Sequence, residues 1–135
     1  MLMRRGVVQP AVESMEIAAP AGKVWTLLTR VEGIPSWYDG WDSVEVPPSA
    51  VERFEVGLTF VLVREDGGRK ARAHCRVTEV VPGRRVAWVE SGDDGDPVLV
   101  RFDLVSDGDD RSTVRFTKAP FRAAGAEPVS GRAAR

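Results

Sequence analysis

The single histidine and the single cysteine of the chain, His74 and Cys75, stand next to each other. A catalytic thiolate–imidazole pair needs both side chains within hydrogen-bond reach, but neighbouring residues of a strand point to opposite faces. The alternating pattern around them predicts a strand, which excludes this pair. One histidine and one cysteine are also too few for a zinc site of the usual kind. We therefore interpret His74 as an exposed residue beside Arg72 and Arg76, and Cys75 as a small core residue.

Glu90 is the remaining candidate for chemistry, although a weak one. It is the one acidic residue on the apolar side of its predicted strand, two positions after Trp88. A carboxylate in that place could anchor a polar group of a ligand or act as a base. The ends of strands are usually exposed to solvent, and this favours a solvated carboxylate instead. Beyond Glu90, the sequence identifies no catalytic residue.

The other charged clusters favour solvated surfaces. Two acidic groups lie in predicted turns, Asp93-Asp94-x-Asp96 and Asp107-x-Asp109-Asp110. Both lack the terminal glutamate of a calcium-binding loop, so we predict no metal site and no cofactor. Basic residues gather on the two central hairpins, namely Arg64, Arg69, Lys70, Arg72, Arg76, Arg84 and Arg85. They could form a patch for an anionic partner, but the interleaved carboxylates favour a solvated face.

Composition limits the class of protein. The chain has 135 residues, 43% of them hydrophobic, and a net charge of −1. This predicts one globular domain and argues against a nucleic-acid binder, which normally carries a strongly basic face. One cysteine excludes an internal disulfide and fits a reducing compartment. The sequence contains no secretory signal pattern and no apolar run long enough for a membrane span, so we expect a cytoplasmic protein.

The elements that position these residues follow from periodicity and turn chemistry. Val12–Ile17 alternates as a strand, and Pro20 opens a helix over residues 20–30 with Val24, Leu27, Leu28 and Val31 on its apolar face. Pro35–Tyr38 begins a second short helix or turn. The strands predicted after Asp42 are Ser43–Val46, Leu58–Arg64, Arg69–Val80, Arg84–Glu90, Val98–Val105 and Ser112–Lys118. Short turns between them predict an antiparallel meander, and hence an α+β fold with one curved sheet of about six strands.

Several motifs together resemble the START-like superfamily, which includes polyketide cyclases and Hsp90-activator-like proteins. The opening Ile17-x-x-Pro20-x-x-x-Val24-Trp25-x-x-Leu28 and Ile34-Pro35-x-Trp37 is similar to that of the family. The segments Val77-Thr78-Glu79-Val80-x-Pro82-x-Arg84-x-Val86-x-Trp88, Val100-x-Phe102-x-Leu104 and Ser112-Thr113-Val114-x-Phe116 resemble its later strands. The likeness covers residues 12–118, between a flexible leader (1–11) and an irregular tail (119–135). It implies a helix-grip-like fold, in which the sheet wraps around the N-terminal helix pair.

The resemblance also implies a concave, pocket-facing side of the sheet. The residues that it places toward a ligand are Phe60, Leu62, Cys75, Trp88, Glu90, Phe102 and Phe116, with Trp37 and Trp41 at the mouth. For most of these the alternative is a plain core role, which is the more common fate of such residues. The two loop tryptophans are harder to explain by packing alone.

One departure from the family concerns the end of the chain. The family closes with a long amphipathic helix over the concave sheet, but residues 119–135 contain Pro120, Gly125, Pro128 and Gly131. Such a segment cannot form a three-turn apolar stripe. We therefore expect a second copy of the chain to cover the concave face, as a homodimer. A tightly bound lipid-like ligand, or a truncated chain, would also explain the missing cover.

Three classes of function remain from the sequence. The first is binding of a hydrophobic small molecule, either a lipid or an aromatic or polyketide-like metabolite. The second is a cyclase or dehydratase that acts on a similar substrate, and the third is a partner-binding module without a ligand. An enzyme needs a polar pair inside the pocket, and only Glu90 suggests one. We therefore favour binding over catalysis.

Overall fold

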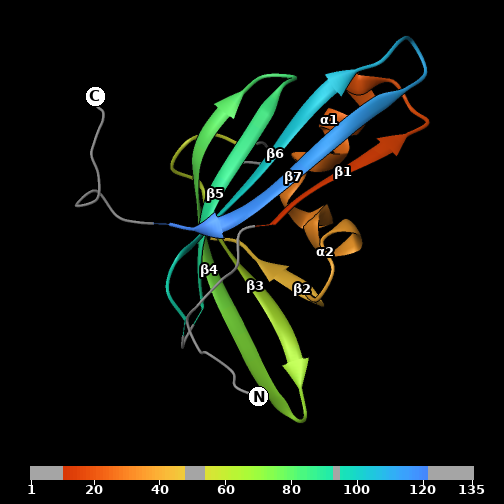
Figure 1. Ribbon diagram of the computed structural model, residues 1–135. Helices are drawn as coiled ribbons and strands as arrows, with labels where there is room; N and C mark the ends of the chain where they lie inside the picture. The colour runs from red at the N-terminus through yellow and green to blue at the C-terminus, as the bar shows by residue number, and fades with distance from the viewer. Residues whose placement is uncertain (1–10, 48–53, 93–94, 122–135) are drawn as a thin grey trace, which may run out of the picture.

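The computed structural model describes residues 11–47, 54–92 and 95–121 (Figure 1). These residues form a curved antiparallel sheet with short helices on one side. In chain order the elements are β1 (Ala11–Ile17), α1 (Ala21–Leu28), a 3-10 turn (Val31–Gly33), α2 (Ile34–Trp37), β2 (Ser43–Glu45), β3 (Thr59–Asp66), β4 (Arg69–Val81), β5 (Arg85–Gly92), β6 (Val98–Ser106) and β7 (Ser112–Pro120). The α+β fold expected from the sequence is confirmed, with seven strands in the sheet.

The strands lie in the order β1-β7-β6-β5-β4-β3-β2, and every neighbouring pair is antiparallel. From β2 to β7 each strand pairs with the next one in the chain, as the short turns predict. Gly67 and Gly68 both have positive φ and form the β3–β4 hairpin turn, where glycine is tolerated best. The β1–β7 pairing joins the two ends of the fold, so β1 and β2 are the edge strands.

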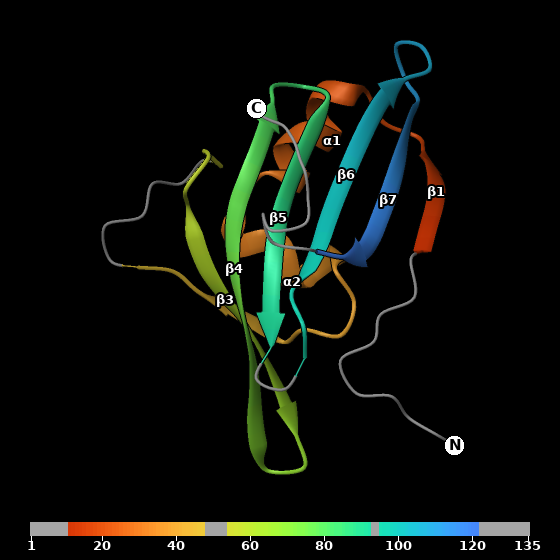
Figure 2. The same cartoon turned by 60° about the vertical axis from the view of Figure 1, so that its left-hand side comes forward.

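The helices cover the concave side of the sheet, as the two views show (Figures 1 and 2). Helix α1 starts after Pro20, whose carbonyl accepts the N–H groups of Lys23 and Val24. It ends at Leu28, two residues before the predicted end. Leu27 is 45% exposed, so the prediction that it belongs to the apolar face is wrong. The helix is too short for a wide apolar stripe and buries only Val24 and Leu28.

The core lies between the helices and the inner face of the sheet. Every second residue of β3 to β7 points inward, and these side chains are largely buried, as the alternation predicts. The largest fully buried side chains of the core come from these strands and, in the case of Ile34, from α2; they are Trp88, Phe60, Ile34, Leu62, Val77, Val86, Val100 and Ser112. The Ser112 hydroxyl donates to the carbonyl of Ala19 at 2.7 Å and ties the start of α1 to β7. A shift of register between Val77 and Glu79 marks a bulge in β4, which increases the local twist of the sheet.

Two expectations from the sequence concern the ends of the chain. The leader lies almost entirely outside the described residues, and so does the part of the tail after Phe121. The prediction that the closing helix is missing therefore falls outside the described part of the chain. No helix in that part has the length and apolar character to cross a membrane.

Candidate functional site

A buried carboxylate lies on the inner face of the sheet. Glu90 on β5 is only 7% exposed, so the prediction of a solvated carboxylate is wrong. The Tyr38 hydroxyl donates to Oε1 at 3.0 Å, and the Trp88 indole N–H donates to the same oxygen at 3.2 Å. The Tyr38 hydroxyl lies 3.4 Å from Oε2. The carboxylate is thus compensated by hydrogen bonds, as a buried charge must be.

The position of Glu90 in the sheet explains its burial. The strand β5 does not end at Glu90 but continues to Gly92. Glu90 pairs with Cys75 on one side and with Val98 on the other, so a strand flanks it on both sides. It also shares the inward parity of Trp88, and the side chain therefore points into the core and not toward the solvent.

Lys118 on β7 connects this carboxylate to the surface. Its Nζ lies 3.8 Å from Oε2 of Glu90 and 5.6 Å from the centre of the Tyr38 ring. The lysine side chain is 34% exposed, whereas the Glu90 side chain is 9% exposed. The ammonium offsets the negative charge but is too distant for a good hydrogen bond. Oxygen Oε2 therefore has weaker partners than Oε1.

The two other ionisable groups of the cluster stay protonated. Burial raises the pKa of the Tyr38 hydroxyl well above its usual value, and the negative charge of Glu90 raises it further. Burial and Glu90 also raise the pKa of the Cys75 thiol in the same way. Tyr38 is therefore a hydrogen-bond donor and not a base. Cys75 is a thiol and not a nucleophile, which agrees with its interpretation as a core residue.

Aromatic rings surround the polar cluster. Trp88 packs against Phe60 and Phe102, with ring centres 5.4 Å and 5.6 Å away. Phe102 also contacts Phe116 and the edge of Trp37, each at 5.0 Å. The indole N–H of Trp37 is buried, and within the described part of the chain it has no hydrogen-bond partner. A buried donor without an acceptor is uncommon in proteins. The Trp37 N–H lies beside the aromatic rings that surround Glu90.

Comparison with known proteins identifies the family. A family model described as polyketide cyclase / dehydrase and lipid transport matches residues 10–135. The chain belongs to this polyketide cyclase / dehydrase and lipid transport family. No curated protein sequence matches the chain. The superfamily expected from the sequence motifs is confirmed.

Solved structures share the fold of this polyketide cyclase / dehydrase family member at low sequence identity. A START superfamily protein from Mycobacterium smegmatis is 16% identical, with a TM-score of 0.68 over 83% of this chain and 76% of that one. The Zhui aromatase/cyclase from a Streptomyces strain is 20% identical, with a TM-score of 0.66 over 87% of this chain and 70% of that one. A conserved protein from Geobacillus kaustophilus is 17% identical, with a TM-score of 0.65 over 82% of this chain and 72% of that one. These likenesses establish the fold.

Within this family member, the residues predicted to contact a ligand fall into two groups. Phe60, Leu62, Cys75 and Trp88 are buried in the packed core, and Phe102 and Glu90 are nearly so. Trp37, Trp41 and Phe116 are partly buried and pack on the edge of the core. The guanidinium of Arg64 lies 5.2 Å from the centre of the Trp41 ring. The structure brings Trp37, Trp88, Phe102 and Phe116 together around Tyr38 and Glu90.

Tyr38 and Lys118 are functional candidates that the sequence interpretation missed. Tyr38 directly follows the short helix α2, where the sequence has no strand-like alternation that would predict its burial. Lys118 was the predicted end of the last strand. Lys118 alternates with the inward residues Val114 and Phe116, and this pattern could have identified it, because a lysine on an apolar face needs a partner.

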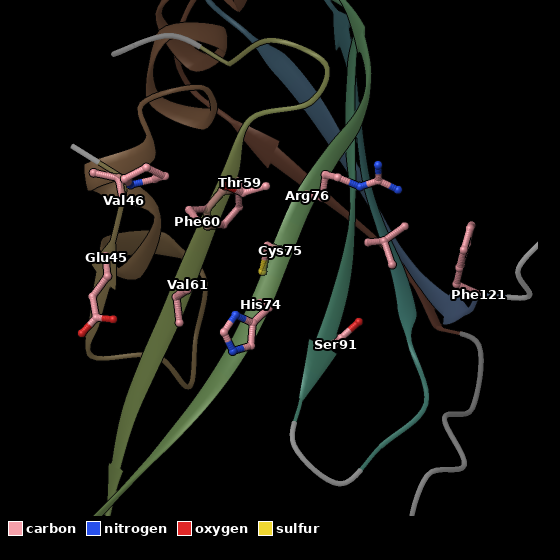
Figure 3. Close-up of a pocket in the computed structure, with 12 residues that line it drawn as sticks. Glu45, Val46, Thr59, Phe60, Val61, His74, Cys75, Arg76, Ser91 and Phe121 are labelled. Atoms are coloured by element: carbon pink, nitrogen blue, oxygen red, sulfur yellow. The ribbon is translucent and has the colours of Figure 1, made fainter. Parts of the chain in front are cut away.

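A hollow of about 590 Å³ lies on the outer face of the sheet, opposite the helices (Figure 3). Its lining includes Val61, His74, Arg76, Val89 and Ser91. The strand register pairs Val61 with His74 and His74 with Ser91, so these side chains share one face. The inward residues Phe60 and Cys75 belong to its floor. His74 is exposed there, as predicted from the sequence. This hollow differs from the apolar, concave pocket that the family resemblance implies.

Proposed function

We propose that this protein binds a hydrophobic aromatic or polyketide-like molecule that carries a hydroxyl group. The observation that carries the proposal is the buried Glu90 carboxylate, surrounded by aromatic rings and hydrogen-bonded mainly through one oxygen. A carboxylate inside an apolar region costs free energy compared with a hydrophobic residue of similar size. Recognition of a polar group on a ligand would explain why a carboxylate occupies this position.

The ligand hydroxyl would donate to Oε2 of Glu90. This oxygen has the two longer contacts, 3.4 Å from Tyr38 and 3.8 Å from Lys118, and so retains the capacity to accept. The Trp37 N–H could donate to a second oxygen of the same molecule. Trp37, Phe116 and Lys118 are only partly buried, and in this proposal an aromatic ring enters and stacks beside them.

The test uses a matched pair of ligands, 2-naphthol and naphthalene, titrated by isothermal calorimetry. In Glu90→Gln a charge-assisted hydrogen bond becomes a neutral one, a difference of about 1.4 kcal/mol. We therefore expect the affinity for 2-naphthol to fall by about tenfold, while the affinity for naphthalene stays unchanged.

The control variant is Glu45→Gln, which removes a carboxylate from the outer side of the sheet. It should leave the affinity for both ligands unchanged. Unchanged binding of 2-naphthol in Glu90→Gln would contradict the role of Glu90. Absence of saturable binding of either ligand to the unmodified protein would contradict the proposed function itself.

Catalysis of a cyclisation or dehydration is the second candidate, and the family name points to it. Such a reaction needs one group that removes a proton and another that returns it. Glu90 could remove a proton, but the pKa values of Tyr38 and Cys75 are raised by burial. Lys118 would have to return the proton. We prefer binding because it needs no proton transfer through these groups.

We also propose that the protein is a homodimer in which a second copy covers β1 and the neighbouring inner face. The edge strand β1 is exposed, and Met15 on its inner face is 63% exposed. An exposed apolar edge strand is a ready template for pairing with another chain. Leu27 of α1 adds a second exposed apolar side chain on the helix side of the sheet.

Sedimentation at micromolar concentration should therefore show a dimer, and Met15→Glu should convert it to monomers because like charges and desolvation oppose pairing. Val105→Glu is the control, since Val105 is also apolar and exposed but points to the outer face of β6. A folded monomer of the unmodified protein would refute the dimer.

A further inference from the structure

Three arginines surround one aspartate on the outer face of the sheet. Asp103 on β6 lies directly opposite Arg85 on β5 and opposite Arg115 on β7. Arg85 donates from Nε to Oδ1 of Asp103 at 2.6 Å, and Arg101 donates from Nε to Oδ2 at 3.1 Å. One carboxylate is therefore shared by two guanidinium groups and faces a third.

The positive charge of this cluster is only partly compensated. Arg115 is exposed, and among the described residues no carboxylate lies within ion-pair distance of it. Glu79 lies 3.3 Å from Nη1 of Arg85 and takes up part of that charge. Like charges on adjacent strands repel each other, and a bound anion would reduce this repulsion.

A hollow of about 720 Å³ opens over this cluster. Besides Arg85, Arg101, Arg115 and Asp103, its lining includes Arg84 and Asp107. Asp107 accepts a hydrogen bond from the Thr113 hydroxyl. Four arginines and two aspartates thus line the hollow, an excess of two positive charges in a protein whose net charge is −1.

The aspartate also fixes the orientation of its arginines. Asp103 is the least exposed member of the ion pairs in this cluster, with 20% of its side chain accessible. Arg101 binds it through Nε, which leaves the terminal Nη groups of the guanidinium as donors for another oxyanion. Planar guanidinium groups held in this way match the oxygens of a phosphate better than a mobile lysine would.

We propose that this hollow on the outer face binds the phosphate group of a phosphate monoester through Arg101 and Arg115. At pH 7 such a group carries a charge of about −1.5 to −2, which is opposite in sign to the net positive charge of the lining. The site lies on the opposite side of the sheet from Glu90, so it is independent of the proposed hydrophobic ligand. A soluble phosphorylated metabolite and the headgroup of phosphatidic acid share this chemistry.

The probe for a soluble ligand is phenyl phosphate, titrated by calorimetry at low ionic strength. The unmodified protein should bind it saturably, and Arg115→Gln should weaken binding by at least about tenfold, because it removes one charge-assisted hydrogen-bond donor. The matched control is Arg72→Gln, which removes the same charge from the outer face. Arg72 pairs with Glu45 and does not line the hollow, so its loss should leave the affinity unchanged.

Vesicles distinguish the source of the phosphate. Sedimentation with phosphatidic acid vesicles, but not with phosphatidylcholine vesicles, and its loss in Arg115→Gln would assign the lipid headgroup. Binding of phenyl phosphate without binding to vesicles would assign a soluble ligand. If Arg115→Gln and Arg72→Gln weaken phenyl phosphate binding equally, the effect comes from the net charge of the protein, and the site is overturned. Lack of saturable binding to both probes would also overturn it. Arg101→Gln gives a second test should Arg115→Gln fail to fold.

Discussion

Replacing Trp88 with alanine is expected to lower the free energy of unfolding by about 3–5 kcal/mol. Trp88 is fully buried at the centre of the aromatic wall, and its indole N–H donates to Glu90. The substitution therefore leaves a large cavity and also removes one of the donors that compensate the buried carboxylate. Urea denaturation followed by far-ultraviolet circular dichroism measures the loss without relying on tryptophan fluorescence.

Trp41→Ala is the matched control for this prediction. Trp41 is also a tryptophan of the inner side, but it is partly exposed and is covered by Arg64. Its removal loses a cation–π contact and part of the packing against the core, so we expect a smaller loss than for Trp88→Ala, about 1–2 kcal/mol. Equal losses in Trp88→Ala and Trp41→Ala would contradict the central position of Trp88 in the core.

Replacing Tyr38 with phenylalanine is expected to lower the free energy of unfolding by about 1.5–3 kcal/mol. The ring keeps its packing on Trp88 and Phe116, and only the hydroxyl is lost. Glu90 then remains buried with a weaker set of donors, namely Trp88 and the more distant Lys118. The same denaturation experiment measures the cost of leaving this charge under-compensated.

A double-mutant cycle with Glu90→Gln isolates the hydroxyl–carboxylate interaction from other effects. If Tyr38 acts through Glu90, Tyr38→Phe should cost much less in the Glu90→Gln background than in the unmodified protein. The same cost in both backgrounds would mean that the tyrosine hydroxyl stabilises the fold in another way. This measurement concerns stability alone and is independent of whether a ligand binds.

The strands were predictable because alternation is a local property of the sequence. Apolar positions at Phe60, Val77, Val100 and Phe102 place one face of each strand against the helices, and turn residues such as Gly67 separate the strands. Every predicted strand end lies within two residues of its place in the structure. The same alternation placed Glu90 on the inner face.

The burial of Glu90 was not predictable in the same way. It depends on how far β5 extends and on its neighbours β4 and β6, which are set by pairing between distant segments. The donors Tyr38 and Lys118 come from the residue that follows α2 and from β7, far from Glu90 in the chain. A single strand pattern shows which face a residue occupies, but it does not show which side chains meet there.

The arginine cluster depends on tertiary pairing even more strongly. The sequence has many arginines on the central hairpins with carboxylates between them, and this pattern predicts that the opposite charges neutralise each other. The register instead places Asp103 between Arg85 and Arg115, so that one carboxylate serves several arginines. Charge counts along the sequence miss such local imbalance because the relevant neighbours are across strands.

The pairing of β1 with β7 has a consequence for synthesis on the ribosome. Ala11 pairs with Lys118, so β1 has no partner strand until nearly all of the described chain has been translated. During this interval the β2–β6 meander can form from local hairpins, whereas the backbone N–H and C=O groups of β1 lack their partners on β7. Pairings between such distant segments form slowly, and unpaired apolar strands are prone to associate with other chains. The nascent protein is therefore most prone to mispairing at β1, until β7 is complete and occupies one edge of that strand.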